Sequence, residues 1–123
     1  PAAEPSKAAA NLPPEEEVFS RGFTILDSEE QAKAASQKLE KQIKAGGVFG
    51  VRGFDKRFYL VSSAFLDRHS GRIIAVLARK DMPLADIAAS AGLEEKACLT
   101  LLQVMKERGD VIEKKRGVFK AVG

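Results

Sequence analysis

The amino-acid sequence predicts an α+β fold, and three observations support this class. Segments in which apolar residues alternate with polar ones, as in a half-buried strand, are interleaved with segments in which apolar residues recur every three or four positions, as in a helix. Glycines and prolines separate these segments. The chain has 123 residues and is 45% hydrophobic, which is enough to form a buried core.

Composition excludes several classes of protein. The single cysteine, Cys98, and the single histidine, His69, cannot form a disulfide framework or a Cys/His zinc site within one chain. The longest apolar stretches are far shorter than the roughly 20 residues that a membrane helix needs, and we find no secretion signal. We therefore expect a soluble cytoplasmic or nuclear protein without a metal ion, a cofactor or a membrane partner.

The sequence predicts three regions. Residues 1–19 contain four of the five prolines and an acidic cluster but few large apolar side chains, so we expect a disordered linker. One lysine and four glutamates give this linker a charge of −3, and the rest of the chain carries 19 basic against 13 acidic residues, or +6. We expect a small strand-helix-hairpin unit over residues 20–63 and a second domain over residues 64–123.

The small unit begins with an alternating apolar pattern that predicts a short strand. Ser28 and Gln31 have the spacing of a capping box, so a helix is expected over residues 29–45, before two consecutive glycines. Two β-rich runs, 48–52 and 57–61, then fit a hairpin.

The second domain begins with apolar residues at helical spacing that predict a helix ending near residue 80. Ser70 and Gly71 leave open whether this helix starts near residue 65 or only near residue 72. A second helix over residues 84–91 follows Pro83, which is expected at its first helical position.

Gly92 is expected to end the second helix, and a third helix is expected over residues 94–107. Two short β-rich runs, 111–112 and 118–119, then form a second hairpin whose tip is basic.

The second and third helices have the spacing of a helix-turn-helix. This motif needs a small residue at the point of closest helix approach, a glycine in the turn and apolar residues at fixed offsets. The matching residues are Ile87, Ala88, Ala91, Gly92, Leu93, Cys98 and Leu101. Residues 84–103 therefore resemble a helix-turn-helix, and residues 66–122 resemble the winged helix-turn-helix superfamily, with three helices and a C-terminal β-hairpin. The resemblance implies a DNA, RNA or protein partner.

The small unit resembles the back end of a degenerate second winged helix. The whole chain is then similar to the tandem winged helices at the C-terminus of the selenocysteine-specific elongation factor, which binds an RNA hairpin. The matching features are the run from Leu39 through Tyr59 and Leu60 to Ile73, and the basic hairpin.

Our first hypothesis is a nucleic-acid-binding module that acts mainly through phosphate contacts from the basic hairpin. The superfamily resemblance adds outward positions of the third helix, and a cation of the first helix could extend the basic surface. The predicted contacts are Lys114, Lys115, Arg116, Lys120, Lys96, Thr100, Gln103 and Arg72.

The alternative is a protein-interaction or adaptor module within a larger assembly. Glu94 and Glu95 lead the third helix, where they would repel phosphate but suit the positive end of the helix. Leu99, if exposed, suits a protein partner better than a nucleic acid. A continuous positive face would favour the first hypothesis, and cations on both faces would favour this one.

No pattern indicates an enzyme or a small-molecule substrate. Cys98 occupies an inward helix position and is expected to be a buried thiol. His69 has no partner that the sequence identifies. Gly50 and Gly53 have the spacing of the GxxG loop of RNA-binding KH domains, but β-forming residues flank them, so we interpret them as turn glycines.

Overall fold

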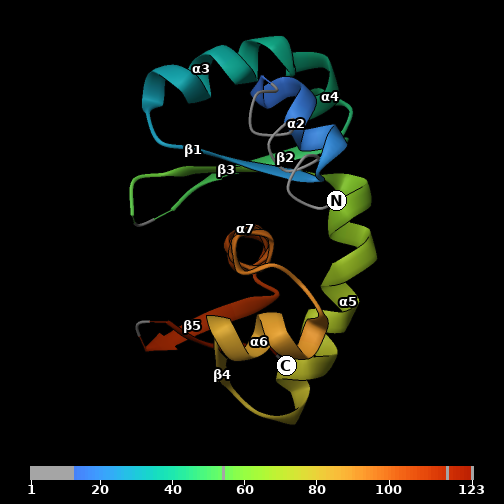
Figure 1. Ribbon diagram of the computed structural model, residues 1–123, viewed down its shortest axis with the longest axis vertical. Coiled ribbons are helices and arrows are strands. Elements are labelled where there is room, and N and C mark those ends of the chain that lie inside the picture. The colour runs from blue at the N-terminus through green and yellow to red at the C-terminus, as the bar shows by residue number, and fades with distance from the viewer. Residues whose placement is uncertain (1–12, 54, 116, 123) are drawn as a thin grey trace, which may run out of the picture. The chain divides into compact units, whose positions relative to one another are not determined.

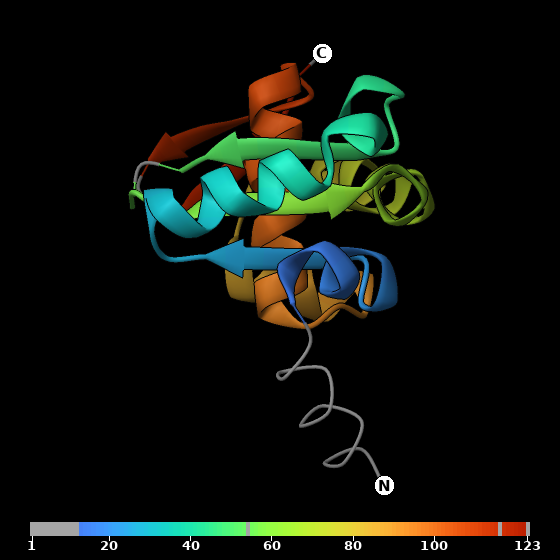
Figure 2. The ribbon, with the colours of Figure 1, turned by 90° about the horizontal axis from the view of Figure 1, so that it is seen from above.

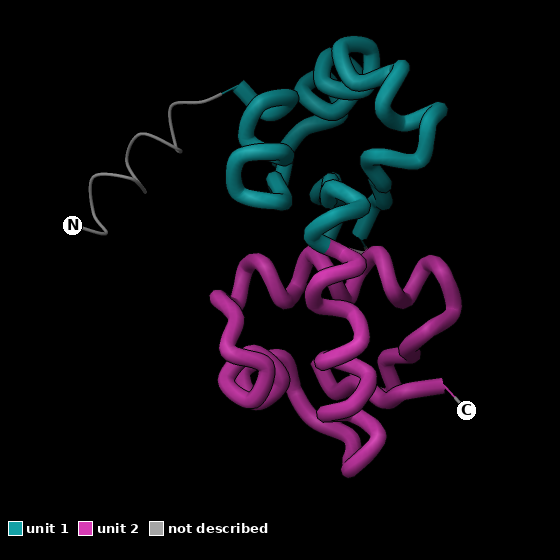
Figure 3. The backbone as a smooth tube through the Cα atoms, turned by 90° about the vertical axis from the view of Figure 1, so that its right-hand side faces the viewer, with its two compact units in different colours: residues 1–65 teal, residues 66–123 magenta. Residues whose placement is uncertain are grey.

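The computed structural model describes residues 13–53, 55–115 and 117–122, apart from the side chain of Lys115. The chain divides into two compact units, Pro1–Phe65 (unit 1) and Leu66–Gly123 (unit 2) (Figure 3). Each unit contains helices and one three-stranded antiparallel sheet, so the predicted α+β class is confirmed. In the described part of the chain, no helix has the length and hydrophobicity needed to cross a membrane.

The sheet of unit 1 contains the predicted strand and hairpin. Its strands are β1 (Phe23–Leu26), β2 (Val48–Arg52) and β3 (Phe58–Ser62), in the order β1-β3-β2 (Figure 2). In the register, Tyr59 of β3 lies opposite a residue of β1 on one side and of β2 on the other. Strand β3 is therefore central, and β1 and β2 are edge strands.

Helix α2 (Pro14–Ser20) occupies the end of the segment for which composition predicts a linker. Pro14 at the start and three glutamates in the first turn are helix-start signals, because proline fixes a helical φ and carboxylates complement the helix dipole. Val18 is fully buried, and the hydroxyl of Thr24 in β1 donates a hydrogen bond to Glu17. Burial of Val18 against the sheet holds this short helix, so residues 14–19 are not a linker; residues 1–12 lie outside the described residues.

The helix expected over residues 29–45 is divided into α3 (Glu29–Lys38) and α4 (Glu40–Lys44). The predicted cap is confirmed, because the Gln31 amide donates to the Ser28 hydroxyl at 3.1 Å. The break lies at Leu39, which has φ −99° and ψ 10° and is the last residue that the segment buries.

Helices α2, α3 and α4 cover one face of the sheet of unit 1 (Figures 1 and 2), and the core of the unit combines buried residues of helices and strands. Its buried members are Val18, Leu26, Ala35, Leu39, Val48 and Leu60. Helices α2 and α3 each contribute a buried residue, whereas α4 contributes none, so α4 is the least anchored helix of the unit.

Helix α5 (Ser63–Arg79) begins before unit 2 and forms its first element. It starts near residue 65, the earlier of the two expected positions, and passes through Gly71. The hydroxyl of Ser62 accepts a hydrogen bond from the Phe65 amide at 3.2 Å and caps the helix. Leu66, Ile73 and Leu77 are buried, and this packing offsets the cost of about 1 kcal/mol for an interior glycine.

The remaining helices and the hairpin of unit 2 follow the predicted order, but a short strand that the sequence did not predict, β4 (Met82–Pro83), precedes the second helix. The other elements are α6 (Leu84–Ala91), α7 (Glu95–Arg108), β5 (Val111–Lys115) and β6 (Val118–Ala121). Pro83 is the residue before α6 rather than its first helical residue, because its backbone is extended and pairs with Val118. The strand order is β4-β6-β5.

The two units repeat one arrangement. In each, the element order is helix, strand, helix, helix, strand, strand, and the first strand pairs with the last. The second of the three strands in sequence is an edge strand in both sheets. The helices differ in length between the units, so the repeat is seen in the element order and the strand pairing.

Two glycine substitutions should have opposite effects on stability. Gly92 has φ +70°, and a Cβ there would touch nothing within 4 Å, so Gly92→Ala should cost about 1 kcal/mol through backbone strain alone. Gly71→Ala, in the interior of α5 and also in open space, should stabilise unit 2 by about 0.5–1 kcal/mol. Urea unfolding measures both; equal effects would contradict the left-handed turn.

Candidate nucleic-acid interface

Helices α6 and α7 meet at a tight turn centred on Gly92. Gly92 has φ 70° and ψ 35°, the left-handed conformation that glycine adopts readily after a helix. The Leu93 amide donates to the Ala88 carbonyl at 2.9 Å and closes the last turn of α6. Helix α7 is seen end-on in Figure 1 whereas α6 lies across the page, so the two helices cross steeply. The predicted corner at Gly92 is confirmed.

Helix α7 is buried over more than half of its circumference. Its buried side chains are Ala97, Cys98, Thr100, Leu101, Leu102, Val104 and Met105. At about 3.6 residues per turn, the remaining positions form one strip along the helix, apart from Arg108 at its C-terminal end. This exposed strip of α7 consists of Glu95, Lys96, Leu99, Gln103, Lys106 and Glu107, of which Leu99, Gln103 and Lys106 are partly exposed. The predicted contacts Lys96 and Gln103 therefore lie on one surface.

Thr100 does not belong to this strip. It is fully buried, and its hydroxyl donates a hydrogen bond to the Lys96 carbonyl at 2.8 Å. Because the hydroxyl is satisfied within the helix, its burial leaves no unpaired polar group. The expectation that Thr100 faces outward is wrong.

The C-terminal hairpin, β5 and β6, is joined to the exposed strip of α7 through Glu113. One carboxylate oxygen of Glu113 accepts a hydrogen bond from Lys106 Nζ at 3.0 Å, and the other accepts one from the Gly117 amide at 2.7 Å. A bulge between Glu113 and Lys115 interrupts the pairing. One side chain therefore both shapes the tip of the hairpin and ties it to α7.

The predicted cations of this hairpin differ in their surroundings. Lys114 Nζ lies 2.7 Å from a carboxylate oxygen of Asp81, and both side chains are partly exposed. Lys120 is exposed on β6 and makes no ion pair with any described residue. Arg116 and the side chain of Lys115 lie outside the described residues.

Arg72 is not brought together with the hairpin. With Arg68 and Arg79 it forms a strip along α5, on the side opposite the buried Ile73 and Leu77. Helix α5 and strand β5 lie at opposite sides of unit 2 in Figures 1 and 2. The cations of unit 2 therefore occupy two sides of it, and none of the three arginines makes an ion pair in the described part of the chain.

The basic excess belongs entirely to unit 2. Unit 2 contains 11 lysines and arginines against 8 aspartates and glutamates, or +3, whereas unit 1 contains nine of each. Among the described residues of unit 2, three cations are paired with carboxylates: Lys106 with Glu113, Arg108 with Asp110 and Lys114 with Asp81. The remaining cations supply the net charge.

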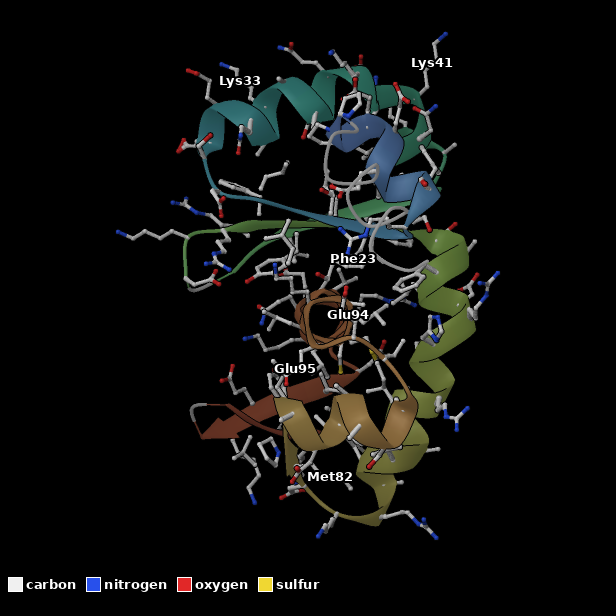
Figure 4. The ribbon with its side chains drawn as sticks, viewed as in Figure 1. Phe23, Lys33, Lys41, Met82, Glu94 and Glu95 are labelled. Carbon is white, nitrogen blue, oxygen red and sulfur yellow. The ribbon has the colours of Figure 1, made fainter. Side chains whose placement is uncertain are left out.

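The start of α7 carries the acidic residues expected there. Glu94 precedes the helix with an extended backbone, and Glu95 is in its first turn (Figure 4). Both side chains are exposed, and Leu99 is partly exposed beside Glu95 on the strip. The three residues proposed for a protein partner therefore lie close together at the start of α7.

Two titratable groups of unit 2 have shifted pKa values. Cys98 is fully buried as expected, and burial, reinforced by the nearby charge of Glu95, raises the pKa of its thiol to about 12. Burial and the charges of Arg68 and Arg72 lower the pKa of His69. Among the described residues, no three histidine, cysteine or acidic side chains form a possible metal site.

The sequence reasoning missed the carboxylates that control this surface. Asp81 and Glu113 pair with Lys114 and Lys106, although Asp81 is 33 residues from its partner. The sequence does contain one indication of such a carboxylate, because Glu113 is the single glutamate beside the basic residues of the hairpin tip. It indicates a structural carboxylate, but not which lysine it binds.

The Cys98 thiol should make unit 2 less stable at alkaline pH. The folded pKa of about 12 exceeds the ordinary value of 9.0, so the folded state holds the proton longer and stability falls as pH rises above about 9. The Cys98→Ala variant has no thiol, so its stability should not show this fall. In urea unfolding, the stability of the natural protein relative to Cys98→Ala should fall by about 1 kcal/mol per pH unit in this range; a constant difference would contradict the shift.

Loss of Glu113 should loosen the hairpin tip. Glu113→Ala removes both hydrogen bonds, so the Gly117 amide should exchange with solvent hydrogen faster, and unit 2 should lose about 1 kcal/mol. Lys106→Met is the matched control, because it breaks the ion pair and keeps the bond to Gly117. Equal exchange rates at Gly117 in the two variants would show that Glu113 does not organise the tip.

Comparisons with protein-family models, with curated proteins and with solved structures found no match for this chain. Its function is therefore inferred from the residues that the fold brings together.

Proposed function

We propose that unit 2 is a winged-helix module that binds nucleic acid mainly through phosphate contacts, with little base readout. The observation that carries the proposal is the direct link between the exposed strip of α7 and the basic C-terminal hairpin, through Lys106 and Glu113 at 3.0 Å. A helix and a hairpin held side by side can follow a nucleic-acid backbone together.

The order of the elements supports the winged-helix assignment. Unit 2 has three helices, a left-handed turn between the second and third, and a closing hairpin. Unit 1 repeats the order and the strand pairing with a very short third helix, α4. This repeat supports a tandem arrangement in which unit 1 is a degenerate winged helix.

The electrostatics favour phosphate contacts of moderate strength. Lys96 and Lys120 are exposed and make no ion pair with described residues, so they can neutralise phosphate directly. Lys114 is paired with Asp81, but an ion pair this exposed contributes only about 0–1 kcal/mol. Phosphate can therefore displace Asp81 without a large penalty.

The exposed strip of α7 is poorly suited to reading bases. It carries Glu95 and Glu107 as well as two lysines, and Lys106 is held by Glu113. Gln103 is the one neutral polar side chain on this strip that could reach a base edge. Binding should therefore depend little on nucleotide sequence.

A titration with duplex DNA and with hairpin RNA at low salt tests the proposal. Replacing Lys114, Lys115 and Arg116 together by alanine should weaken binding and reduce the log-log salt slope by about 0.9 for each phosphate of duplex DNA that the protein no longer neutralises. Arg68, Arg72 and Arg79→Ala is the control, because it removes the same charge from α5. The proposal is wrong if neither nucleic acid binds, or if the α5 variant loses as much affinity as the hairpin variant.

A protein-interaction module is the second candidate, and a specific observation favours it. Cations lie on two sides of unit 2, and the hairpin and the residue after it expose Ile112 and Val122, at 45% and 53%. Leu99 with Glu94 and Glu95 would then form the contact on α7. A titration in which no nucleic acid binds would favour this function.

A further inference from the structure

Strand β2 in unit 1 presents a free edge beside an apolar groove. Because the sheet order is β1-β3-β2, β3 is the only described strand that pairs with β2. We propose that this edge binds an extended peptide that carries an acidic side chain and adds to the sheet as a fourth strand. The peptide's backbone would supply the hydrogen bonds, and its side chains would enter the groove.

The hydrogen-bond phase of the hairpin identifies the free backbone groups. The Gly53 amide donates to the Arg57 carbonyl at 2.8 Å. The Ser63 amide donates to the Gly47 carbonyl, also at 2.8 Å. In an antiparallel pair, hydrogen-bonded positions alternate. The backbone N–H and C=O groups of the odd-numbered residues of β2 therefore point toward β3, and those of the even-numbered residues point away from it. The residues whose backbone groups point away from β3 are Val48, Gly50 and Arg52. None of them has a backbone hydrogen-bond partner among the described residues.

The groove has a volume of about 330 Å³ and lies between the helices and this edge. Ala32 and Ser36 of α3 and Ile43 of α4 form its wall, and Phe58 and Leu60 of β3 are on the sheet side. Ile43 is 37% exposed, so part of its apolar side chain is open to solvent at the groove. The groove is therefore a mostly apolar surface directly next to unpaired backbone.

Gly50 leaves room for the Leu60 side chain in the lining of the groove. A Cβ atom at this position would lie 2.8 Å from Leu60 Cδ2, so the cross-strand side chain occupies the space above the glycine. A residue of an added strand opposite Gly50 meets no side chain on β2 itself. It can therefore place an apolar side chain against Leu60 and Ile43.

Arg52 is the reason that we expect the bound peptide to carry an acidic side chain. Its guanidinium lies 5.5 Å from the centre of the Phe58 ring, which holds the side chain beside the groove. It is exposed and forms no ion pair with the described residues, and it is the one charged residue among those described that lines the groove. A carboxylate two positions from the apolar residue would lie opposite Arg52 and complete its pairing.

Strand β5, the corresponding edge of the sheet in unit 2, is better protected against strand addition. It has a bulge and consecutive lysines, two devices that keep edge strands from pairing with other chains. Strand β2 has five residues in regular register, with no proline, lysine or bulge. This difference indicates that the β2 edge is left available for a partner.

The test uses phage-displayed random octapeptides selected on the full chain. Selected peptides should carry an acidic residue two positions from an apolar one, and binding should protect the amides of Val48, Gly50 and Arg52 from hydrogen exchange. Arg52→Glu should weaken a selected peptide at least tenfold, and a lysine in place of the peptide's acidic residue should restore binding. Every second backbone amide of an added strand donates a hydrogen bond to β2. N-methylation of this set of peptide amides should therefore abolish binding, whereas N-methylation of the other set should not.

Lys33→Glu is the matched charge reversal, since Lys33 lies on α3 away from the groove lining (Figure 4), and it should leave affinity unchanged. Failure to enrich any peptide, or equal affinity for Arg52→Glu, overturns the proposal. So does a homodimer that Arg52→Glu dissociates, because a second copy would then occupy the edge. Nucleic acid that shifts the Gly50 and Arg52 resonances when no peptide does would also overturn it.

Discussion

The left-handed turn at Gly92 is the constraint on which the arrangement of unit 2 depends. A β-carbon is disfavoured at φ 70°, so glycine lets the chain leave α6 and enter α7 at a steep angle within three residues. The direction of α7 then decides which of its side chains are buried and which form the exposed strip. It also places Lys106 beside Glu113 on the hairpin. The ion pairs Lys106–Glu113 and Lys114–Asp81 reduce the positive charge that a ligand would meet on this surface. If unit 2 binds nucleic acid as we propose, this pairing favours reversible, salt-sensitive binding over tight, sequence-specific recognition.

The two units use the same strand pairing for different surfaces. In unit 2 the edge strand β5 is bulged and basic, whereas in unit 1 the corresponding strand β2 is regular and nearly uncharged. The third helix is 14 residues long in unit 2 and only five in unit 1. A short third helix leaves the groove beside β2 open, and a long one fills the interior of unit 2. The repeat therefore presents two unlike surfaces, both of which we propose as binding sites.

The sequence by itself determined the elements whose signals are local. These elements are the helix cap at Ser28, the end of α6 at Gly92 and both hairpins. Each depends on residues a few positions apart, so each can be predicted without a structure. The short helix α2 was missed because composition dominated the interpretation of its segment, although Pro14 and the acidic first turn were local signals.

Only the tertiary structure decided what each surface residue does. Thr100 is buried because of where α7 lies, and Lys114 is paired because the fold brings Asp81 to it from 33 residues away. The open edge of β2 follows from the pairing of β1 with β3, which no local pattern specifies. Burial and long-range pairing depend on which elements become neighbours, and hydrophobic periodicity gives the faces of an element but not its neighbours.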